Sequence, residues 1–525
     1  MRGKVMLMLM MSVAMSCGKE DMRTDRNLNY EYGRNIPHDK IVLGDRLENP
    51  YKTENITKAL QSLYPTKADR VDVRPTNLYV RFLPENDAEF EMLKGLTTDL
   101  MDHPLDYDIL VEGDWYHDPE VPEGDVTWQY AVVPPDFDFP EGIPYEVIDE
   151  CYIAENDFGT RGDGIDWDAV EKEAYRLTGN EDMITPQLTK ASVKSTPSGR
   201  ITIVDDLYCG GKPLGVSGVR ISCNSFVKFS NAYTDRDGYY QMDKSFSADP
   251  RYRIVFKNEK GFSIGFNMVL VPASVSTLGK SGPEGVDITI TEKSDDKLFR
   301  RCAVNNAAYD YYSRCSPDDL DISSPPSDLR IWIFGNFNSS SAVMLHHGAV
   351  VDSDLVSSFL GKYAGLVKYF LPDITIGANF ADNYQGLYSS TSHELSHASH
   401  FAKVGTSFWN RYIKYIIESY VTSGGKTYGD GTKSDAGYCE IGEMWAYYLE
   451  SRIFKDRYGG NFPTFGTSHW FSPQIFRYLD DRGLATSSIF SVLDEEIHSK
   501  EALKSALTST FPEKRKIIDQ VFSRY

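Results

Sequence analysis

The stretch His393-Glu394-Leu395-Ser396-His397 decides how the C-terminal part of this chain is interpreted. In an α-helix, residues i and i+4 share one face with their Cβ atoms about 6 Å apart, so both imidazoles can bind one Zn²⁺ ion. Glu394 follows the first histidine and can hold a metal-bound water and accept its proton. The stretch therefore predicts a helix that carries a zinc site, with Glu394 as general base.

This match to the H-E-x-x-H pattern is informative because the chain has only 10 histidines among 525 residues. About 0.01 chance matches are expected in a chain of this composition. Leu395, Ala398 and Ala402 can face a core, which leaves the histidine side of the helix for a metal. The alternatives are a helix with two surface histidines and a metal-free descendant of an enzyme.

A zinc enzyme takes a third protein ligand and keeps a fourth position for water. His400 lies on the same predicted helix, about 10 Å along the axis from His393, which is too far to share the ion. The stretch from Gly437 to Tyr448 offers Glu440 and Glu443 as candidates. The alternative for both glutamates is a solvated helix face.

The histidine and glutamate stretches together resemble the gluzincins, zinc peptidases that bind the metal through two histidines and one downstream glutamate. Glu443-Met444-Trp445-Ala446 matches the Glu-x-x-Ala form of their glutamate helix and follows His397 by 46 residues. The resemblance covers about residues 370 to 500. It implies a zincin-like domain, Zn²⁺ as cofactor, and His393, His397 and Glu443 as metal ligands. It also implies hydrolysis of peptide bonds by metal-activated water.

The resemblance leaves several neighbouring roles open. Tyr447 stands where some gluzincins have an aspartate that orients the first histidine, so Glu440 is a candidate for that role and remains the second choice as third ligand. Gluzincins often stabilise the oxyanion with a downstream histidine or tyrosine. Four residues are candidates for this role, and the sequence does not rank them: Tyr428, Tyr438, His469 and His498.

The formal net charge of −21 restricts the partners of the chain. Nucleic-acid binding needs Lys and Arg side chains that neutralise phosphates, and electrostatic docking on anionic lipid needs a basic surface. We therefore expect no nucleic acid as a partner. The resemblance to gluzincins implies a peptide or protein as substrate. The acidity itself is typical of a soluble protein in an exposed compartment.

The N-terminus has the pattern of a secretion signal. Arg2 and Lys4 precede the apolar run 5–14, which is too short to span a bilayer but has the length of a signal-peptide apolar region. Ala14-Met15-Ser16-Cys17 resembles the lipobox of bacterial lipoproteins, with Ala14 where that family favours leucine. The resemblance implies that Cys17 is lipidated and that its acyl group anchors the protein in outer-membrane lipid.

The next four residues, 18–21, are similar to short acidic tags that send some lipoproteins to the cell surface of Gram-negative bacteria. A surface-exposed, lipid-anchored protein is therefore the expected localisation. The alternative is a plain secretory signal in which the cysteine is incidental.

Composition and periodicity predict a multidomain chain. Residues 78–83 and 107–111 alternate as strands of an α+β module, and strand-like runs followed by helices make the C-terminal part α+β and mainly helical. The predicted segments are a signal peptide (1–17), a flexible stalk (18–45), an α+β N-terminal module (46–190), an all-β sandwich (199–290) and a zincin-like domain (295–525).

The predicted sandwich contains the runs 200–204, 218–221, 234–240 and 252–256, in an order that resembles carboxypeptidase regulatory-like domains. The resemblance implies a transthyretin-like β-sandwich that serves as a spacer or a binding module. Asp235 and Asp237 are expected to form a turn rather than a calcium site, because further spaced oxygen ligands are missing.

Six cysteines follow Cys17, and no Cys-x-x-Cys pair occurs among them. An exported protein can keep disulfides, and the pairs nearest in sequence are Cys209 with Cys223 and Cys302 with Cys315. Six cysteines allow 15 connectivities, so the pairing stays open. His346 and His347 are expected on a strand, where neighbouring side chains point to opposite faces and cannot share a site.

The leading interpretation is a zinc-dependent peptidase. The first alternative is a protein- or glycan-binding lipoprotein whose zincin-like domain has lost activity. The second is a structural partner in a larger outer-membrane complex. A serine hydrolase is not expected, because no Gly-x-Ser-x-Gly elbow occurs in the chain.

Overall fold

The computed structural model describes most of the chain from residue 40 onward. The described residues are 40–66, 71–85, 89, 92–93, 100–122, 127–157, 164–184, 196–265, 273–293, 296–335, 338–349, 371–379, 383–423, 428–459 and 469–525. The predicted signal peptide with Cys17, and the predicted stalk up to residue 39, lie outside them.

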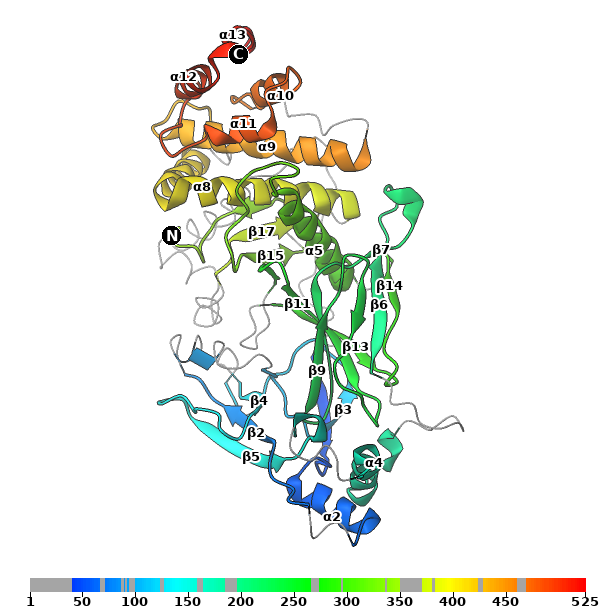
Figure 1. Ribbon diagram of the computed structural model, residues 1–525. Coiled ribbons are helices and arrows are strands. Elements are labelled where there is room, and N and C mark those ends of the chain that lie inside the picture. The colour runs from blue at the N-terminus through cyan, green and yellow to red at the C-terminus, as the bar shows by residue number, and fades with distance from the viewer. Residues whose placement is uncertain are drawn as a thin grey trace, which may run out of the picture.

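The N-terminal part is a small mixed unit at the lower end of the molecule (Figure 1). Among its described residues, three strands form the antiparallel sheet β4-β2-β5 and two form the ribbon β1-β3. Its elements are β1 (Val42–Arg46), α2 (Thr53–Leu63), β2 (Asn77–Phe82), β3 (Tyr107–Val111), β4 (Gln129–Val133), β5 (Tyr145–Cys151) and α4 (Trp167–Leu177). The two predicted strands are confirmed as β2 and β3.

The middle part consists of short strands in two facing sheets. One sheet has the order β10-β6-β14 with β7 beside β6, and the other contains β13, β11, β8 and β9. The strands are β6 (Ser198–Ile203), β7 (Leu214–Gly215), β8 (Val219–Ser225), β9 (Lys228–Tyr233), β10 (Tyr239–Gln241), β11 (Arg251–Asn258), β12 (Ser263–Ile264), β13 (Val275–Lys280) and β14 (Ile288–Ile290). Their inward side chains, such as Ile201, Ile221 and Ile254, share one core.

The predicted turn in this region is confirmed. The carboxylate of Asp235 accepts hydrogen bonds from the backbone N–H groups of Asp237 and Tyr239, both at 2.9 Å. Gly238 follows with a φ of 84°, a backbone conformation that glycine adopts without strain. The Asp235 carboxylate therefore stabilises the turn.

The C-terminal part is mainly helical and covers one end of the sheet (Figure 1). Helix α8 packs against β16, β17 and α5, α9 lies on the other side of α8, and helices α10 to α13 lie beyond α9 (Figure 1). The elements are α5 (Asp296–Arg314), β15 (Arg330–Phe334), β16 (Ser341–Ala342), β17 (Ile374–Gly377), α8 (Tyr384–Ser423), α9 (Ala436–Tyr458), α10 (Gln474–Asp480), α11 (Thr486–Ser491), α12 (Lys500–Thr510) and α13 (Arg515–Phe522). The mainly helical character predicted for this part of the chain is confirmed.

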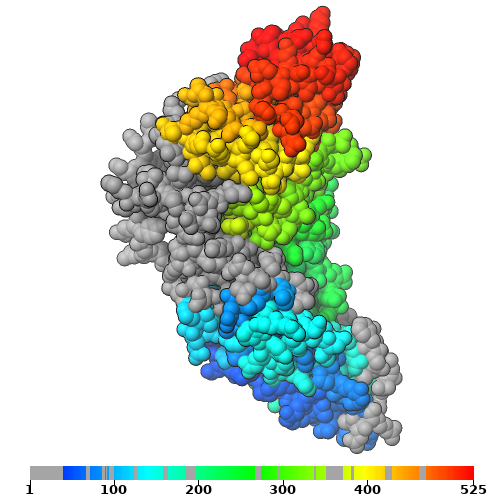
Figure 2. Space-filling model, turned by 90° about the vertical axis from the view of Figure 1, so that its left-hand side faces the viewer, coloured from blue at the N-terminus to red at the C-terminus, as the bar shows by residue number. Residues whose placement is uncertain are grey.

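The middle and C-terminal parts share a sheet. In the described part of the chain, the largest sheet has eight strands in the order β16-β17-β15-β12-β11-β8-β9, with β13 on β11. The junction is the parallel pairing of β12 with β15, in which Ser263 lies opposite Arg330 and Ile264 opposite Ile331. One hydrophobic core also runs from Ile201 to Val521. The two segments therefore form one folded body, which Figure 2 shows as a continuous surface between the N-terminal module and the last helices.

Helix α8 is interrupted once, at Gly405, where φ is 77° and ψ is −176°. The helix that the sequence predicted around His393 is the part of α8 before this break, and a second part continues from the break to Ser423. Helix α9 is buried without interruption from Cys439 to Ser451, as expected of a helix enclosed by other elements on all sides. No helix among the described residues is long and apolar enough to cross a membrane.

The structure answers one question about side chains that the sequence left open, and it corrects one prediction. The six described cysteines are all free, so neither Cys209–Cys223 nor Cys302–Cys315 is a disulfide. His346 and His347 lie in a turn after β16 rather than on a strand. Because a turn does not alternate the direction of its side chains, their rings stand 5.0 Å apart.

The N-terminal module is joined to the middle part by a buried ion-pair network. Lys228 on β9 is 1% exposed and its Nζ contacts Glu155 at 2.8 Å and Glu171 on α4 at 2.7 Å. The hydroxyl of Tyr51 also donates to Glu171, at 3.1 Å. A charge buried this deeply must be paired, so the network fixes how the module docks.

We predict that Lys228→Ala lowers the free energy of unfolding by about 3–5 kcal/mol, because it leaves Glu171 buried without its cation. Burial lowers the pKa of Lys228, but the two glutamates raise it above its ordinary value. The stabilisation is therefore complete below the unfolded-state pKa of about 10.4 and is lost only as the pH rises through the higher folded-state pKa. Denaturant unfolding at pH 7 and pH 10 should therefore give the same loss of unfolding free energy for the variant, because both values lie below the unfolded-state pKa.

Lys212→Ala is the control, because Lys212 is exposed. It should change the free energy of unfolding by less than about 0.5 kcal/mol. An equally small effect of Lys228→Ala would contradict the stabilising role of the network.

Candidate metal centre

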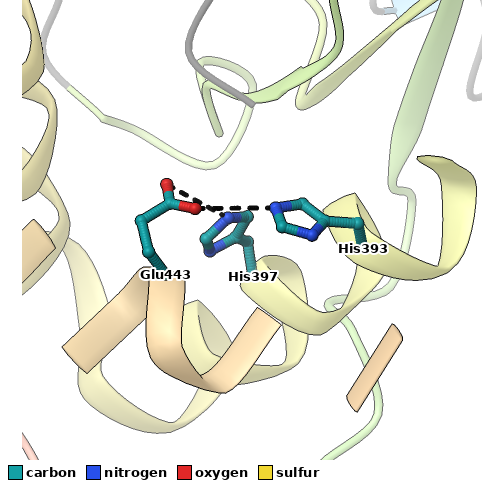
Figure 3. Close-up of side chains that lie close together, drawn as sticks. All are labelled: His393, His397 and Glu443. Carbon is teal, nitrogen blue, oxygen red and sulfur yellow. Dashed lines mark ion pairs between the residues drawn. The ribbon is translucent and has the colours of Figure 1, made fainter. Parts of the chain in front are cut away.

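Three candidate ligands meet between α8 and α9. His393 and His397 stand one turn apart on α8, and Glu443 faces them from α9 (Figure 3). Their ligand atoms all lie within 4.8 Å of one another. The Glu443 carboxylate oxygens lie 3.6 Å from Nε2 of each histidine. This separation is longer than a direct hydrogen bond and suits atoms arranged around an ion.

The three side chains are enclosed by the protein. His393 is 3% exposed, and His397 and Glu443 are fully buried. Burial lowers the pKa of His397, and the opposing effect of Glu443 does not reverse this. Burial acts to raise the pKa of Glu443, but His397 and His393 outweigh it and hold that pKa below its usual range. A neutral imidazole and an ionised carboxylate are the forms that bind a metal, so this group can hold a metal ion at neutral pH.

The neighbours of these ligands fix their orientation. Nδ1 of His393 lies 3.1 Å from the carboxylate of Glu450, and the Ser389 hydroxyl donates to the same carboxylate. This contact directs Nε2 of His393 towards Glu443. The Tyr412 hydroxyl donates to Glu443 at 2.5 Å. Each element of the site therefore carries both a ligand and a group that positions a ligand on the other helix.

Sequence reasoning missed Glu450. It proposed Glu440 for the role of orienting His393, whereas Glu440 lies 3.4 Å from Lys500 and is not one of the three converging groups. Although residues three apart lie on nearly the same helix face, Glu440 pairs with Lys500 and only Glu443 joins the two histidines. Glu450 follows Glu443 by seven residues, two full turns, and this spacing was the signal available in the sequence.

Glu394, the predicted base, is fully buried on α8 beside the ligands. His400 is also buried, but it lies outside the converging group. Its ring packs edge-on against Phe408 at 5.0 Å, and neither ring nitrogen has a hydrogen-bond partner among the described residues. Burial, with smaller effects of His397 and Lys403, lowers its pKa to about 3. His400 is therefore a neutral packing residue.

The four candidates for oxyanion stabilisation fall into two places. Tyr438 and His498 stack on each other at 4.6 Å, and Tyr438 packs against Phe408. Tyr428 and His469 instead gather at Tyr447, whose ring contacts that of His393 edge-on at 4.6 Å. The hydroxyl of Tyr428 lies 3.4 Å from that of Tyr447. The ring centre of His469 lies 5.8 Å from that of Tyr447. Of the two sets, the second makes a ring contact with a candidate ligand, His393.

Glu443→Gln should weaken zinc binding by more than about 100-fold, because it replaces an ionised ligand by a neutral amide. Glu440→Gln is the matched control and should leave the dissociation constant unchanged. Competition with a chromogenic chelator measures both. The reverse ranking would place the third ligand at Glu440.

Glu450→Gln tests the neighbour of His393. The amide cannot accept the N–H hydrogen bond with the strength of a carboxylate, so zinc affinity should fall by about 10- to 100-fold without loss of the ligand set. An affinity equal to that of the unaltered protein would show that Glu450 does not orient His393.

No family model, curated protein or solved structure matches this chain. The function must therefore be inferred from the geometry of the site itself.

Proposed function

We propose that this protein is a zinc-dependent peptidase. The observation that carries the proposal is the convergence of His393, His397 and Glu443 within 4.8 Å in a buried site, with Glu394 next to the first ligand. Two imidazoles and one carboxylate are the donor set of several catalytic zinc sites, which keep a further position for water.

Zinc bound at this site would supply a Lewis acid that polarises a carbonyl group and lowers the pKa of water. The protein residues perform the remaining tasks. Glu394 takes the proton from the attacking water and delivers it to the leaving amine. Glu450 and Tyr412 hold His393 and Glu443 in place, so little reorganisation is needed during the reaction.

Peptide hydrolysis also requires stabilisation of the negative charge that develops on the carbonyl oxygen. We assign it to the group of Tyr428, Tyr447 and His469, because it adjoins His393. His469 is partly exposed and stacks on Phe471 at 5.0 Å, so it is accessible from solvent and held by packing. The competing pair, Tyr438 and His498, is occupied in packing near Phe408.

Glu394→Gln is the variant that tests the function. It preserves the three ligands and removes the base, so hydrolysis of a peptide library by the zinc-loaded protein should fall by about 100- to 10,000-fold, with zinc affinity unchanged. Product analysis by mass spectrometry measures cleavage and reveals the preferred residues. Glu440→Gln serves as the control and should retain full activity.

Two results would contradict the peptidase. Equal cleavage by the Glu394→Gln variant and the unaltered protein would place the reaction elsewhere. Zinc binding without any cleavage by the unaltered protein would favour the alternative of a zincin-like binding protein.

A further inference from the structure

A buried carboxylate from the middle part of the chain contacts α9, one of the two helices that carry the candidate ligands. Asp205 lies two residues after β6 and is fully buried. Its Oδ2 accepts hydrogen bonds from Nη2 of Arg457 at 3.0 Å and from the Tyr458 hydroxyl at 2.8 Å. Its Oδ1 accepts from the backbone N–H of Leu207 at 3.3 Å. One side chain therefore fixes its own loop and holds the end of α9.

The Arg457 guanidinium is also enclosed by tyrosine rings. It lies 4.0 Å from the ring centre of Tyr208, 4.7 Å from that of Tyr388 and 5.3 Å from that of Tyr384. Tyr208 belongs to the loop of Asp205, whereas the other two belong to the first turns of α8. Arg457 thus connects the loop after β6, the start of α8 and the end of α9. Among the described residues, Asp205 is the only carboxylate that pairs with it.

This connection lies close to the candidate metal centre along both helices. On α8, Tyr388 is followed directly by Ser389, whose hydroxyl donates to Glu450. On α9, Glu450 lies seven residues before Arg457, which is about two helical turns. Glu450 in turn contacts Nδ1 of His393 at 3.1 Å. The distance between α8 and α9 at His393 therefore depends on the position of Arg457.

We propose that Asp205 is a positioning residue of the metal centre: by holding Arg457 against Tyr384 and Tyr388, it sets the spacing of α8 and α9 at His393 and Glu450. The proposal rests on zinc being the ion of the proposed function. It makes the middle part of the chain a component of the site rather than a spacer. The shared sheet, in which β12 pairs with β15, supports the same conclusion.

The physical reason is the burial of the pair. The Arg457 side chain is 12% exposed and the Asp205 side chain 0%. A guanidinium left in this place without its carboxylate must draw in water or move away from the rings, because an uncompensated buried charge is strongly unfavourable. Either response separates the ends of α8 and α9.

Asp205→Asn in the full chain is the test, and Asp206→Asn is the matched control, because Asp206 is the exposed neighbour with the same chemical change. Two quantities are measured well below the melting temperature: the zinc dissociation constant, by chelator competition, and the visible absorption spectrum of Co²⁺ bound in place of zinc. For Asp205→Asn, the zinc dissociation constant should rise about tenfold and the Co²⁺ bands should shift. The control should leave both unchanged.

A purely structural role would lower the melting temperature of Asp205→Asn without changing either readout, and that result would overturn the proposal. If Asp205→Asn does not fold, Arg457→Lys decides, because lysine keeps the charge but loses the planar group that lies over the tyrosine rings. It should weaken zinc binding in the same direction, and unchanged binding would again overturn the proposal. Zinc binding by the unaltered protein without peptide cleavage would refute the peptidase but not this inference, whereas an absence of zinc binding would refute both.

Discussion

The structure around the candidate site depends on the pairing of two buried glutamates on α9 with two histidines on α8. An isolated carboxylate in a protein interior costs several kcal/mol, and α9 is buried on all sides where Glu443 and Glu450 stand. His397 and His393 face Glu443, and Ser389 and His393 contact Glu450. A shift of either helix by one turn would break this set of contacts and leave buried polar groups without their partners.

Two tryptophans keep the helices in this register. Nε1 of Trp445 on α9 donates to the backbone carbonyl of Ser396 on α8 at 3.1 Å, and Nε1 of Trp409 on α8 donates to the carbonyl of Ala342 on β16 at 3.1 Å. Both indole groups are fully buried, so each needs its single acceptor. These two hydrogen bonds link α9 to α8 and α8 to the edge of the eight-stranded sheet. They therefore hold the two helices that carry the candidate ligands in place.

The sequence predicted the parts of this arrangement that depend on local geometry. The spacing of His393 and His397 fixes a shared helix face, and the resemblance around Glu443 identified the third member of the group. Glu450 was missed although it follows Glu443 by two helical turns, because α9 is buried on all sides and has no polar face that would draw attention to an inward glutamate. The junction of β12 with β15 was missed because β12 has two residues, Ser263 and Ile264, and pairs with a strand far along the chain.

The charges of the candidate ligands also determine which kind of ion the site can bind best. Without a metal, His393 and His397 can neutralise Glu443 and Glu450 only when the imidazoles are protonated. A histidine that binds a metal through Nε2 is neutral. When a metal is bound, the positive charge opposite Glu443 must therefore come from the ion. A divalent cation carries twice the charge of one imidazolium. The pKa of His397, lowered by burial, makes this exchange easier because the ring gives up its proton below the usual pH. The buried ligand set is therefore balanced by a dication better than by protons at neutral pH, and the balance reverses as the pH falls and protons compete for the histidines.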